Sequence, residues 1–129
     1  MRLSQGIDIV NVDRLRAAMD NNAAFVKEIF TEEEQLYCLR HRNPHVHFAG
    51  RFAAKEAFLK AAGTGFLNAG IFREIEVMVM PSGRPSLRLS GWAVKLLKRL
   101  KAHESAVSIS HTPQFAVSSV IIVSEGEQT

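Results

Sequence analysis

The sequence has a single cysteine and no long apolar run. Cys38 has no second cysteine with which to form an internal disulfide, so we expect a reducing, cytoplasmic location. The longest clean apolar segment, residues 120–123, has the length of a strand and falls far short of the roughly 20 residues that a membrane span needs. The first six residues lack the apolar stretch of a secretory signal. We therefore expect no membrane association.

Tryptophan, tyrosine and net charge are also limited. The chain has one tryptophan, one tyrosine and a formal net charge of +3. Its basic residues cluster at 14–16 and 95–101, which fits either a solvated helix face or a surface for an anionic partner. Because no aromatic side chains are interleaved with these clusters, we expect no nucleic-acid partner. A basic, non-enzymatic nucleic-acid-binding module remains the alternative function.

The length and composition indicate one globular domain. The chain has 129 residues, of which 47% are hydrophobic and 22% charged. A chain of this size can bury a real core and has the usual length of one domain. No internal repeat, linker or change of composition divides it. We expect a single domain over residues 1–123, followed by a polar tail at 124–129.

The periodicity of apolar residues predicts an α+β fold with a small antiparallel sheet and helices packed on it. Alternation indicates strands at 6–10, 75–79, 87–89, 106–111 and 115–123, the last two joined as a hairpin. Helical spacing indicates helices near 12–19, from 31 to about 41, at 44–62 and after Ser90. Thr31 and Glu34 match a capping box, and Asn43 and Ser90 are candidate caps.

Glu56 is the most unusual residue of the 44–62 helix. It falls in the middle of the apolar half of the helix, whereas Arg51 and Lys55 are expected on the other side. A carboxylate in that position is costly unless a cation neutralises it. Two interpretations remain open: an ion pair with Lys60 one turn later, or a metal ion shared with a second carboxylate.

Asp8 is the candidate for that second carboxylate. It lies between two isoleucines on the first expected strand, where it could also simply face solvent. Mg²⁺ is usually bound by one or two carboxylates together with water and substrate phosphates, and Lys60 could add a positive charge for a phosphate oxygen. The residues themselves thus predict a Mg²⁺ and phosphate site of Asp8, Glu56 and Lys60.

Other candidates are weaker. Residues 63–65 (Gly-Thr-Gly) could cradle a phosphate, but a helix end explains them better. His111 closes a strand and is either a structural residue or a contact for an anionic ligand. The histidines around residue 44 do not have a standard zinc spacing, so we expect no zinc.

Several motifs together resemble the family of holo-acyl-carrier-protein synthases, which are phosphopantetheinyl transferases. These are Gly-Ile-Asp-Ile-Val at 6–10, Arg-Phe-Ala-Ala-Lys-Glu-Ala at 51–57 with Lys60, Gly-Thr-Gly at 63–65, Gly-Arg-Pro at 83–85 and Ser-Ile-Ser-His at 108–111. They cover nearly the whole chain in the order typical of the family. Phe66 and Pro113 depart from the usual pattern without touching the expected metal ligands, which leaves the shape of the coenzyme pocket less defined.

The resemblance implies an activity: transfer of 4′-phosphopantetheine from coenzyme A to a serine of acidic apo-acyl-carrier protein, for fatty-acid biosynthesis. Adenosine 3′,5′-bisphosphate is released. By the same resemblance, Asp8 and Glu56 hold Mg²⁺, Glu56 or a neighbouring water accepts the serine proton, and Lys60 neutralises the leaving phosphate.

The resemblance also implies binding residues and an assembly. Coenzyme A is expected near Arg51, Gly83, Pro85, His111 and Lys60, with His111 contacting one of its phosphates. Arg14 is similar to the family arginine that meets the acidic carrier protein. The family further implies a homotrimer with sites between subunits.

Overall fold

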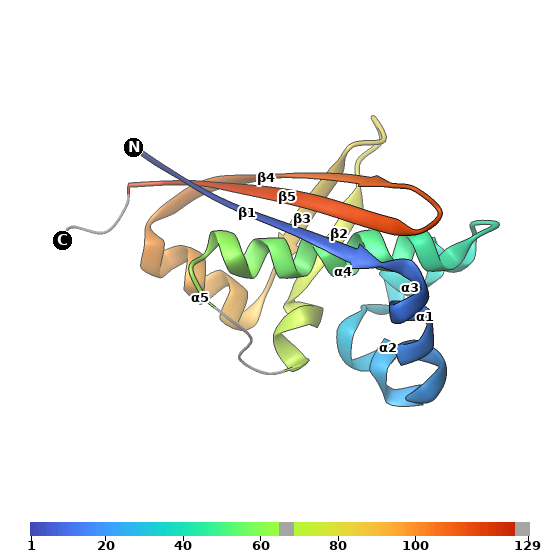
Figure 1. The fold of residues 1–129 in the computed structure, drawn as a ribbon. Coiled ribbons are helices and arrows are strands. Elements are labelled where there is room, and N and C mark those ends of the chain that lie inside the picture. The colour runs from blue at the N-terminus through green and yellow to red at the C-terminus, as the bar shows by residue number, and fades with distance from the viewer. Residues whose placement is uncertain (65–68, 126–129) are drawn as a thin grey trace.

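The computed structural model describes residues 1–64 and 69–125, and its strands form two antiparallel sheets (Figure 1). In the first sheet, β5 (Phe115–Ser124) lies between β1 (Arg2–Asn11) and β4 (Ala102–His111). The second contains β2 (Ile75–Val79) and β3 (Pro85–Leu89). The α+β class with a small antiparallel sheet is confirmed. Most of the expected polar tail, residues 126–129, lies outside the described residues, and Ser124 ends β5.

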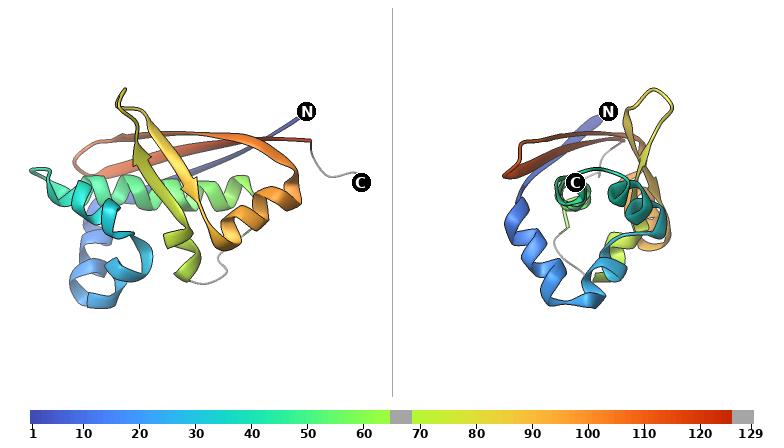
Figure 2. Two further views of the ribbon diagram at one scale, coloured as in Figure 1. Left: turned by 180° about the vertical axis from the view of Figure 1, so that it is seen from behind. Right: turned by 90° about the vertical axis from the view of Figure 1, so that its right-hand side faces the viewer.

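Helix α4 (Pro44–Ala61) is the centre of the molecule. The three-stranded sheet covers one side of it, and the end-on view shows the other helices around the rest (Figure 2). These are α1 (Val12–Asn21), α2 (Ala23–Ile29), α3 (Glu32–Leu39), the 3₁₀ helix η1 (Ala69–Glu74) and α5 (Gly91–Leu100). Small residues facing the sheet, among them Ala49, Ala53 and Ala57, are fully buried. No helix in the described part of the chain is long and apolar enough to cross a membrane.

Gly6 allows β1 to lie directly on α4. A Cβ atom at this position would stand 2.6 Å from the backbone nitrogen of Ala61 and 2.9 Å from Cβ of Lys60, and would also collide with the carbonyl oxygen of Ala57. A glycine is therefore required where the strand crosses the helix. This close approach brings the middle of β1 beside the last two turns of α4.

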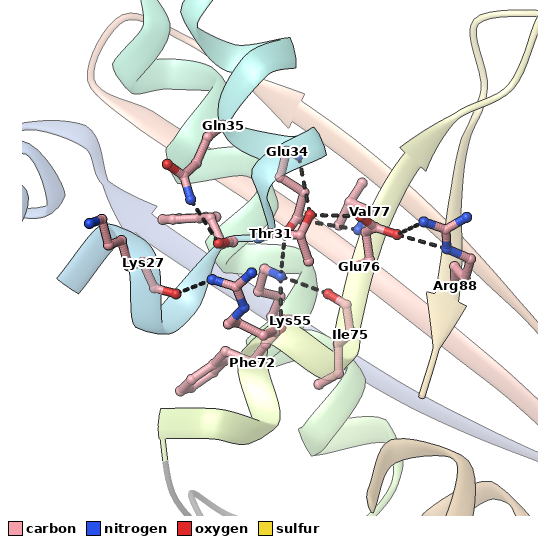
Figure 3. A network of polar contacts seen from close by, with 12 residues as sticks. Lys27, Thr31, Glu34, Gln35, Lys55, Phe72, Ile75, Glu76, Val77 and Arg88 are labelled. Atoms are coloured by element: carbon pink, nitrogen blue, oxygen red, sulfur yellow. Dashed lines mark hydrogen bonds and ion pairs between the residues drawn. The ribbon is translucent and has the colours of Figure 1, made fainter. Parts of the chain in front are cut away.

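Arg51 and Lys55 lie on the other side of α4 from Glu56, as expected, but that side is buried as well. Arg51 is 5% exposed and Lys55 is fully buried, because α3, η1 and β2 cover the side of α4 opposite the sheet. The Lys55 ammonium group donates to Glu34 Oε1 at 2.8 Å and to the carbonyl oxygens of Phe72 and Ile75, each at 2.7 Å (Figure 3). Every donor of this buried cation thus has an acceptor.

A second buried carboxylate connects the β2–β3 hairpin to α3. Glu76 accepts a hydrogen bond from the Thr31 hydroxyl at 2.6 Å and pairs with the Arg88 guanidinium (Figure 3). The capping box of Thr31 and Glu34 is confirmed, and Glu34 also accepts from the backbone nitrogen of Val77 at 2.9 Å. These bonds hold the hairpin in a defined place beside α3.

The remaining differences from expectation concern one additional helix, the ends of helices, and the starts of β1 and β4, which lie four residues earlier than expected. Helix α2 has no counterpart in the expected elements, and α3 ends at Leu39, two residues early. Asn43 and Ser90 occupy cap positions but make no side-chain cap bond. The first turn of α5 is capped instead by Glu74, whose carboxylate accepts from the backbone nitrogens of Trp92 at 2.7 Å and Ala93 at 3.3 Å.

Candidate active site

The groove between β1, α1, α2 and the end of α4 brings together Asp8, Glu56 and Lys60. Its volume is about 550 Å³. Its lining combines charged and apolar side chains. The residues that line it are Asp8, Ile9, Val10, Asn11, Arg14, Leu15, Ala18, Phe25, Phe52, Glu56 and Lys60.

Asp8 reaches the groove because β1 presents alternate residues to opposite faces. Ile7 and Ile9 are exposed on the outer face of the sheet, whereas Asp8 points inward with Gly6 and Val10. Its side chain is 17% exposed and its Oδ1 accepts from Lys60 Nζ at 3.1 Å. The same ammonium group donates to the carbonyl oxygen of Ile7 at 3.0 Å. Lys60 therefore forms its ion pair with Asp8. An ion pair between Lys60 and Glu56 alone does not describe the site, although Lys60 does lower the pKa of Glu56.

Glu56 is half-buried in an unfavourable electrostatic setting. Burial raises the pKa of its carboxyl, the negative charge of Asp8 raises it further, and Lys60 lowers it. The two carboxylates thus act on each other across the groove, with one ammonium group to balance them. Such a pair favours an added cation.

The donor set fits a hard divalent cation of the magnesium type. Two carboxylates are what Mg²⁺ usually takes from a protein, since water and substrate phosphates supply its other ligands. Within residues 1–64 and 69–125, no group of three or more histidine, cysteine or acidic side chains is arranged to hold a metal ion.

Arg14 opens onto the same groove from the first turn of α1. The helix starts there because Asn11 caps it, accepting from the backbone nitrogen of Arg14 at 3.0 Å. The groove continues from Arg14 over an apolar wall that includes Phe25 of α2 and Phe52 of α4. This wall was absent from the sequence candidates, because the short α2 carries no clear periodicity.

Arg51 does not join this groove. Its guanidinium lies 3.9 Å from the ring centre of Tyr37, and its Nε has no hydrogen-bond partner. Together with Arg40 and Arg88 it lines a separate groove of about 400 Å³ between α3 and the β2–β3 hairpin. Arg51 is therefore on the far side of α4 from Glu56.

His111 lies on β4, the opposite edge strand of the sheet from β1: it pairs with Ala116 of β5, whereas Asp8 of β1 pairs with Ser118. The ring centre of His111 is 5.4 Å from that of His47, near the start of α4, and the ring of His41 stacks on His47 with the centres 3.8 Å apart. No sequence pattern connects His111 with His41 and His47, because His111 is distant from them in the chain and meets His47 only through the fold.

Gly83 and Pro85 lie at the turn of the β2–β3 hairpin. Gly83 has φ of +90°, a conformation that favours glycine. Pro85 borders a groove of about 270 Å³ between the hairpin and β4. Gly63 ends α4 with φ of +76°, as expected for a helix end, while Gly65 and Phe66 lie outside the described residues.

The family model of the 4′-phosphopantetheinyl transferase superfamily matches residues 4–118. The chain belongs to this superfamily. It is 42% identical over 127 residues to the holo-[acyl-carrier-protein] synthase of Clostridium tetani, with 98% of each chain covered. The transferase resemblance read from residues 6–10 and 51–57 is thus confirmed.

Solved structures of the superfamily share the fold of this transferase. An ACPS–CoA complex from Chronobacterium ammoniagenes has a TM-score of 0.86 at 28% identity, covering 97% of this chain and 99% of the other. A holo-(acyl-carrier-protein) synthase from Bacillus anthracis in complex with CoA has a TM-score of 0.76 at 34% identity, covering 95% and 96%. The fold and the family are therefore established together.

Proposed function

We propose that this transferase moves the 4′-phosphopantetheine group of coenzyme A to a serine hydroxyl of an acidic apo-acyl-carrier protein. The serine oxygen forms a bond to phosphorus, the bond to the adenosine 3′,5′-bisphosphate leaving group breaks, and the serine loses its proton. The convergence of Asp8, Glu56 and Lys60 on one groove supports this reaction. The proposed pathway is fatty-acid biosynthesis in the cytoplasm.

Asp8 and Glu56 are the residues that would hold Mg²⁺. When bound, this ion supplies positive charge that offsets the charge of the coenzyme pyrophosphate and stabilises the departing phosphate. Glu56 is suited to accept the serine proton, because burial and Asp8 both raise its pKa above that of an ordinary glutamate.

Lys60 is placed to interact with the leaving phosphate. An ammonium group has three N–H donors. Two of them are used on the Asp8 carboxylate and the Ile7 carbonyl, which fix the position of Nζ at the edge of the groove. The third is available for a phosphate oxygen.

Arg14 is proposed to guide the carrier protein. It lines the same groove as Asp8 and Glu56, so an acidic segment that paired with Arg14 would lie next to them. Opposite charges on two surfaces accelerate their encounter and orient it. Binding at Arg14 would thus place the carrier protein next to the reacting end of coenzyme A.

The proposed assembly is a homotrimer with sites between subunits. The outer face of β1 exposes apolar side chains, Leu3 at 63% and Ile7 at 60%, as expected of a covered face. In addition, His111 meets α4 at His47, 13 residues before Lys60, which corresponds to about 20 Å along the helix axis. We therefore expect His111, Arg51, Gly83 and Pro85 to contact coenzyme A bound at the Asp8 and Glu56 of a neighbouring copy.

The experiment that tests this proposal measures the mass of the carrier protein. The transferase is incubated with coenzyme A, Mg²⁺ and an apo-acyl-carrier protein, and the carrier is analysed by mass spectrometry. The expected result is a gain of one phosphopantetheine, abolished by EDTA and by replacing the acceptor serine with alanine. A carrier of unchanged mass in the complete mixture would contradict the proposal.

A further inference from the structure

Helix α5 presents a basic surface that the proposed function does not use. We call it the α5 surface, and it consists of five exposed residues: Trp92, Lys95, Lys98, Arg99 and Lys101. At 100° per residue, the four of them that belong to the helix itself fall within an arc of about 120°. The opposite side of α5 packs into the core through Ala93 and Leu96, which are buried. The basic side chains therefore gather on one outward face of the helix.

Negative charge is scarce around the α5 surface. Between Glu76 and Glu104 the sequence has basic residues at positions 84, 88, 95, 98, 99 and 101 and no aspartate or glutamate. Within residues 1–64 and 69–125, no basic side chain of the α5 surface forms an ion pair. Two carboxylates near the ends of this segment are engaged elsewhere: Glu74 caps the first turn of α5, and Glu125 pairs with His103. The α5 surface thus carries positive charge without a paired carboxylate.

Helix stability accounts for only part of this surface. Cations in the last turn of a helix interact favourably with its dipole, which gives Lys98 and Arg99 a structural role. The dipole gives no reason for Trp92, whose side chain is 50% exposed in the first turn of α5. Tryptophan is enriched where one end of a side chain meets an apolar phase and the other meets water. The exposed indole therefore points to a binding surface.

The position of Lys95 against Trp92 indicates which kind of partner this surface fits. Lys95 Nζ lies 4.7 Å from the centre of the Trp92 ring, a cation–π arrangement. That face of the ring is therefore occupied and is not free to stack on a nucleic-acid base. The pair instead places an apolar ring directly beside an ammonium group. Such amphipathic side chains are favoured at membrane surfaces, where acyl chains lie next to phosphates.

We propose that the α5 surface binds reversibly to membranes that contain anionic phospholipids. Its basic side chains pair with lipid headgroups, and Trp92 enters the headgroup region. Helix α5 lies toward one end of the molecule, whereas α1, which carries Arg14, lies toward the other (Figures 1 and 2). The contact is thus separate from the proposed carrier site. The expectation of no membrane association was based on the lack of a spanning segment and a signal, neither of which a reversible surface contact needs.

Trp92 makes this contact directly measurable, because it is the single tryptophan of the chain. Its fluorescence is recorded while vesicles are added, made either of phosphatidylcholine alone or with about 30% phosphatidylserine. We expect emission to shift to shorter wavelength, with less quenching by acrylamide, for the anionic vesicles only. Salt at about 0.5 M should reverse the shift, because it limits interactions between exposed charges to roughly 4 Å.

Two variants separate the charge of the α5 surface from its indole ring, with vesicle co-sedimentation as the measurement. The triple variant Lys95→Gln, Lys98→Gln, Arg99→Gln should reduce the binding constant by roughly an order of magnitude or more. Each basic residue near an anionic membrane contributes about fivefold to binding. Trp92→Ala leaves the net charge unchanged, and we expect it to weaken binding at least about threefold through the loss of the buried ring.

The matched control removes the same charge from exposed positions on other elements: Arg16→Gln, Lys27→Gln, Arg40→Gln. Equal losses for the two triple variants would overturn the proposal, as would a wild type that does not bind anionic vesicles at low salt. An unshifted emission of Trp92 in vesicle-bound protein would also refute it. Preferential binding of polyglutamate or an oligonucleotide would assign the surface to an acidic protein or a nucleic acid instead. The wild-type measurements decide the question even if a variant fails to fold, and phosphopantetheine transfer without vesicles tests only the proposed function.

Discussion

The ammonium group of Lys55 and the carboxylate of Glu34 lie 2.8 Å apart with both side chains fully buried. Burial lowers the pKa of Lys55, and the Glu34 carboxylate opposes this effect. Lys55 also donates to the carbonyl oxygens of Phe72 and Ile75, while Glu34 accepts from the backbone of Val77. One ion pair thus links α4 to α3, η1 and β2.

Replacing Lys55 with methionine should lower the free energy of unfolding by about 3–5 kcal/mol, because the Glu34 carboxylate would remain buried without its cation. The double variant Lys55→Met, Glu34→Gln should recover part of this loss. Arg88→Met is the matched control, since that side chain is 61% exposed and its pair with Glu76 should contribute roughly 1 kcal/mol. Urea denaturation measures all three, and equal losses for Lys55→Met and Arg88→Met would refute the prediction.

Gly6→Ala should destabilise the protein by about 2 kcal/mol or more, because the added Cβ meets the backbone of α4 and β1 must move away. Gly50→Ala provides the comparison. Its Cβ would meet only Cγ2 of Ile109, at 2.8 Å, and a side-chain methyl can rotate aside. The helix propensity of alanine offsets the remaining cost, so we expect a change below about 1 kcal/mol. Thermal unfolding of both variants checks the difference.

Glu56→Gln should raise the melting temperature at pH 8 in EDTA. The folded protein holds the pKa of Glu56 above its unfolded value, so the carboxylate is unfavourable once ionised. This cost is absent below the unfolded pKa and grows as the pH rises through the folded one. The increase in melting temperature caused by Glu56→Gln should accordingly become smaller toward pH 4. Adding Mg²⁺ should stabilise the wild type more than the variant, and equal stabilisation would count against a metal role for Glu56.

The same substitution should reduce turnover by roughly two orders of magnitude or more. An amide cannot accept the serine proton, and it carries no charge to neutralise a divalent cation. Product formation followed by carrier mass provides the measurement, with circular dichroism to verify the fold. Full activity in Glu56→Gln would remove this residue from the reaction.

Arg14→Glu should raise KM for the carrier protein at least several-fold and leave KM for coenzyme A nearly unchanged. A charge at the edge of a protein–protein interface mainly affects how fast the two proteins associate. Arg16→Glu changes the net charge identically on the same helix, but Arg16 does not line the groove. A comparable rise in both variants would indicate general electrostatics. A rise confined to coenzyme A would show that the assignment of Arg14 is incorrect.

Ile7→Lys should convert the proposed trimer to smaller species by placing a charge on the outer face of the sheet. Leu39→Lys is the matched control, because Leu39 is similarly exposed, at 63%, but lies at the end of α3. Sedimentation velocity distinguishes the two. A monomeric wild type, or an unchanged mass for Ile7→Lys, would argue against assembly through β1.

Local patterns predicted most of the elements, because alternation and helical spacing report which side of an element is buried. The hairpin of β4 and β5 and the strand at 75–79 followed directly from them. Helical spacing does not describe the surroundings of α4 correctly. Most of its residues are buried, and Arg51 and Lys55 are among them although they lie opposite the apolar half of the helix. Their partners, such as Glu34, come from other elements that no local pattern identifies.

The two carboxylates of the candidate site could be predicted from the sequence, whereas most of the residues around them could not. Glu56 stood out as a charge among apolar residues, and Asp8 as a charge on a buried strand. The stacking of His41 on His47, and the apolar wall with Phe25, depend on how separate elements pack. Such juxtapositions carry no signal in the order of residues alone.

Cys38 is the single cysteine of the chain and is completely buried, and burial raises the pKa of its thiol to about 12. Because thiolates rather than thiols react with maleimides, this residue should stay unmodified in the folded protein. A free maleimide dye should therefore leave the folded enzyme unlabelled. One cysteine introduced on the surface would likewise provide a unique attachment point for a dye.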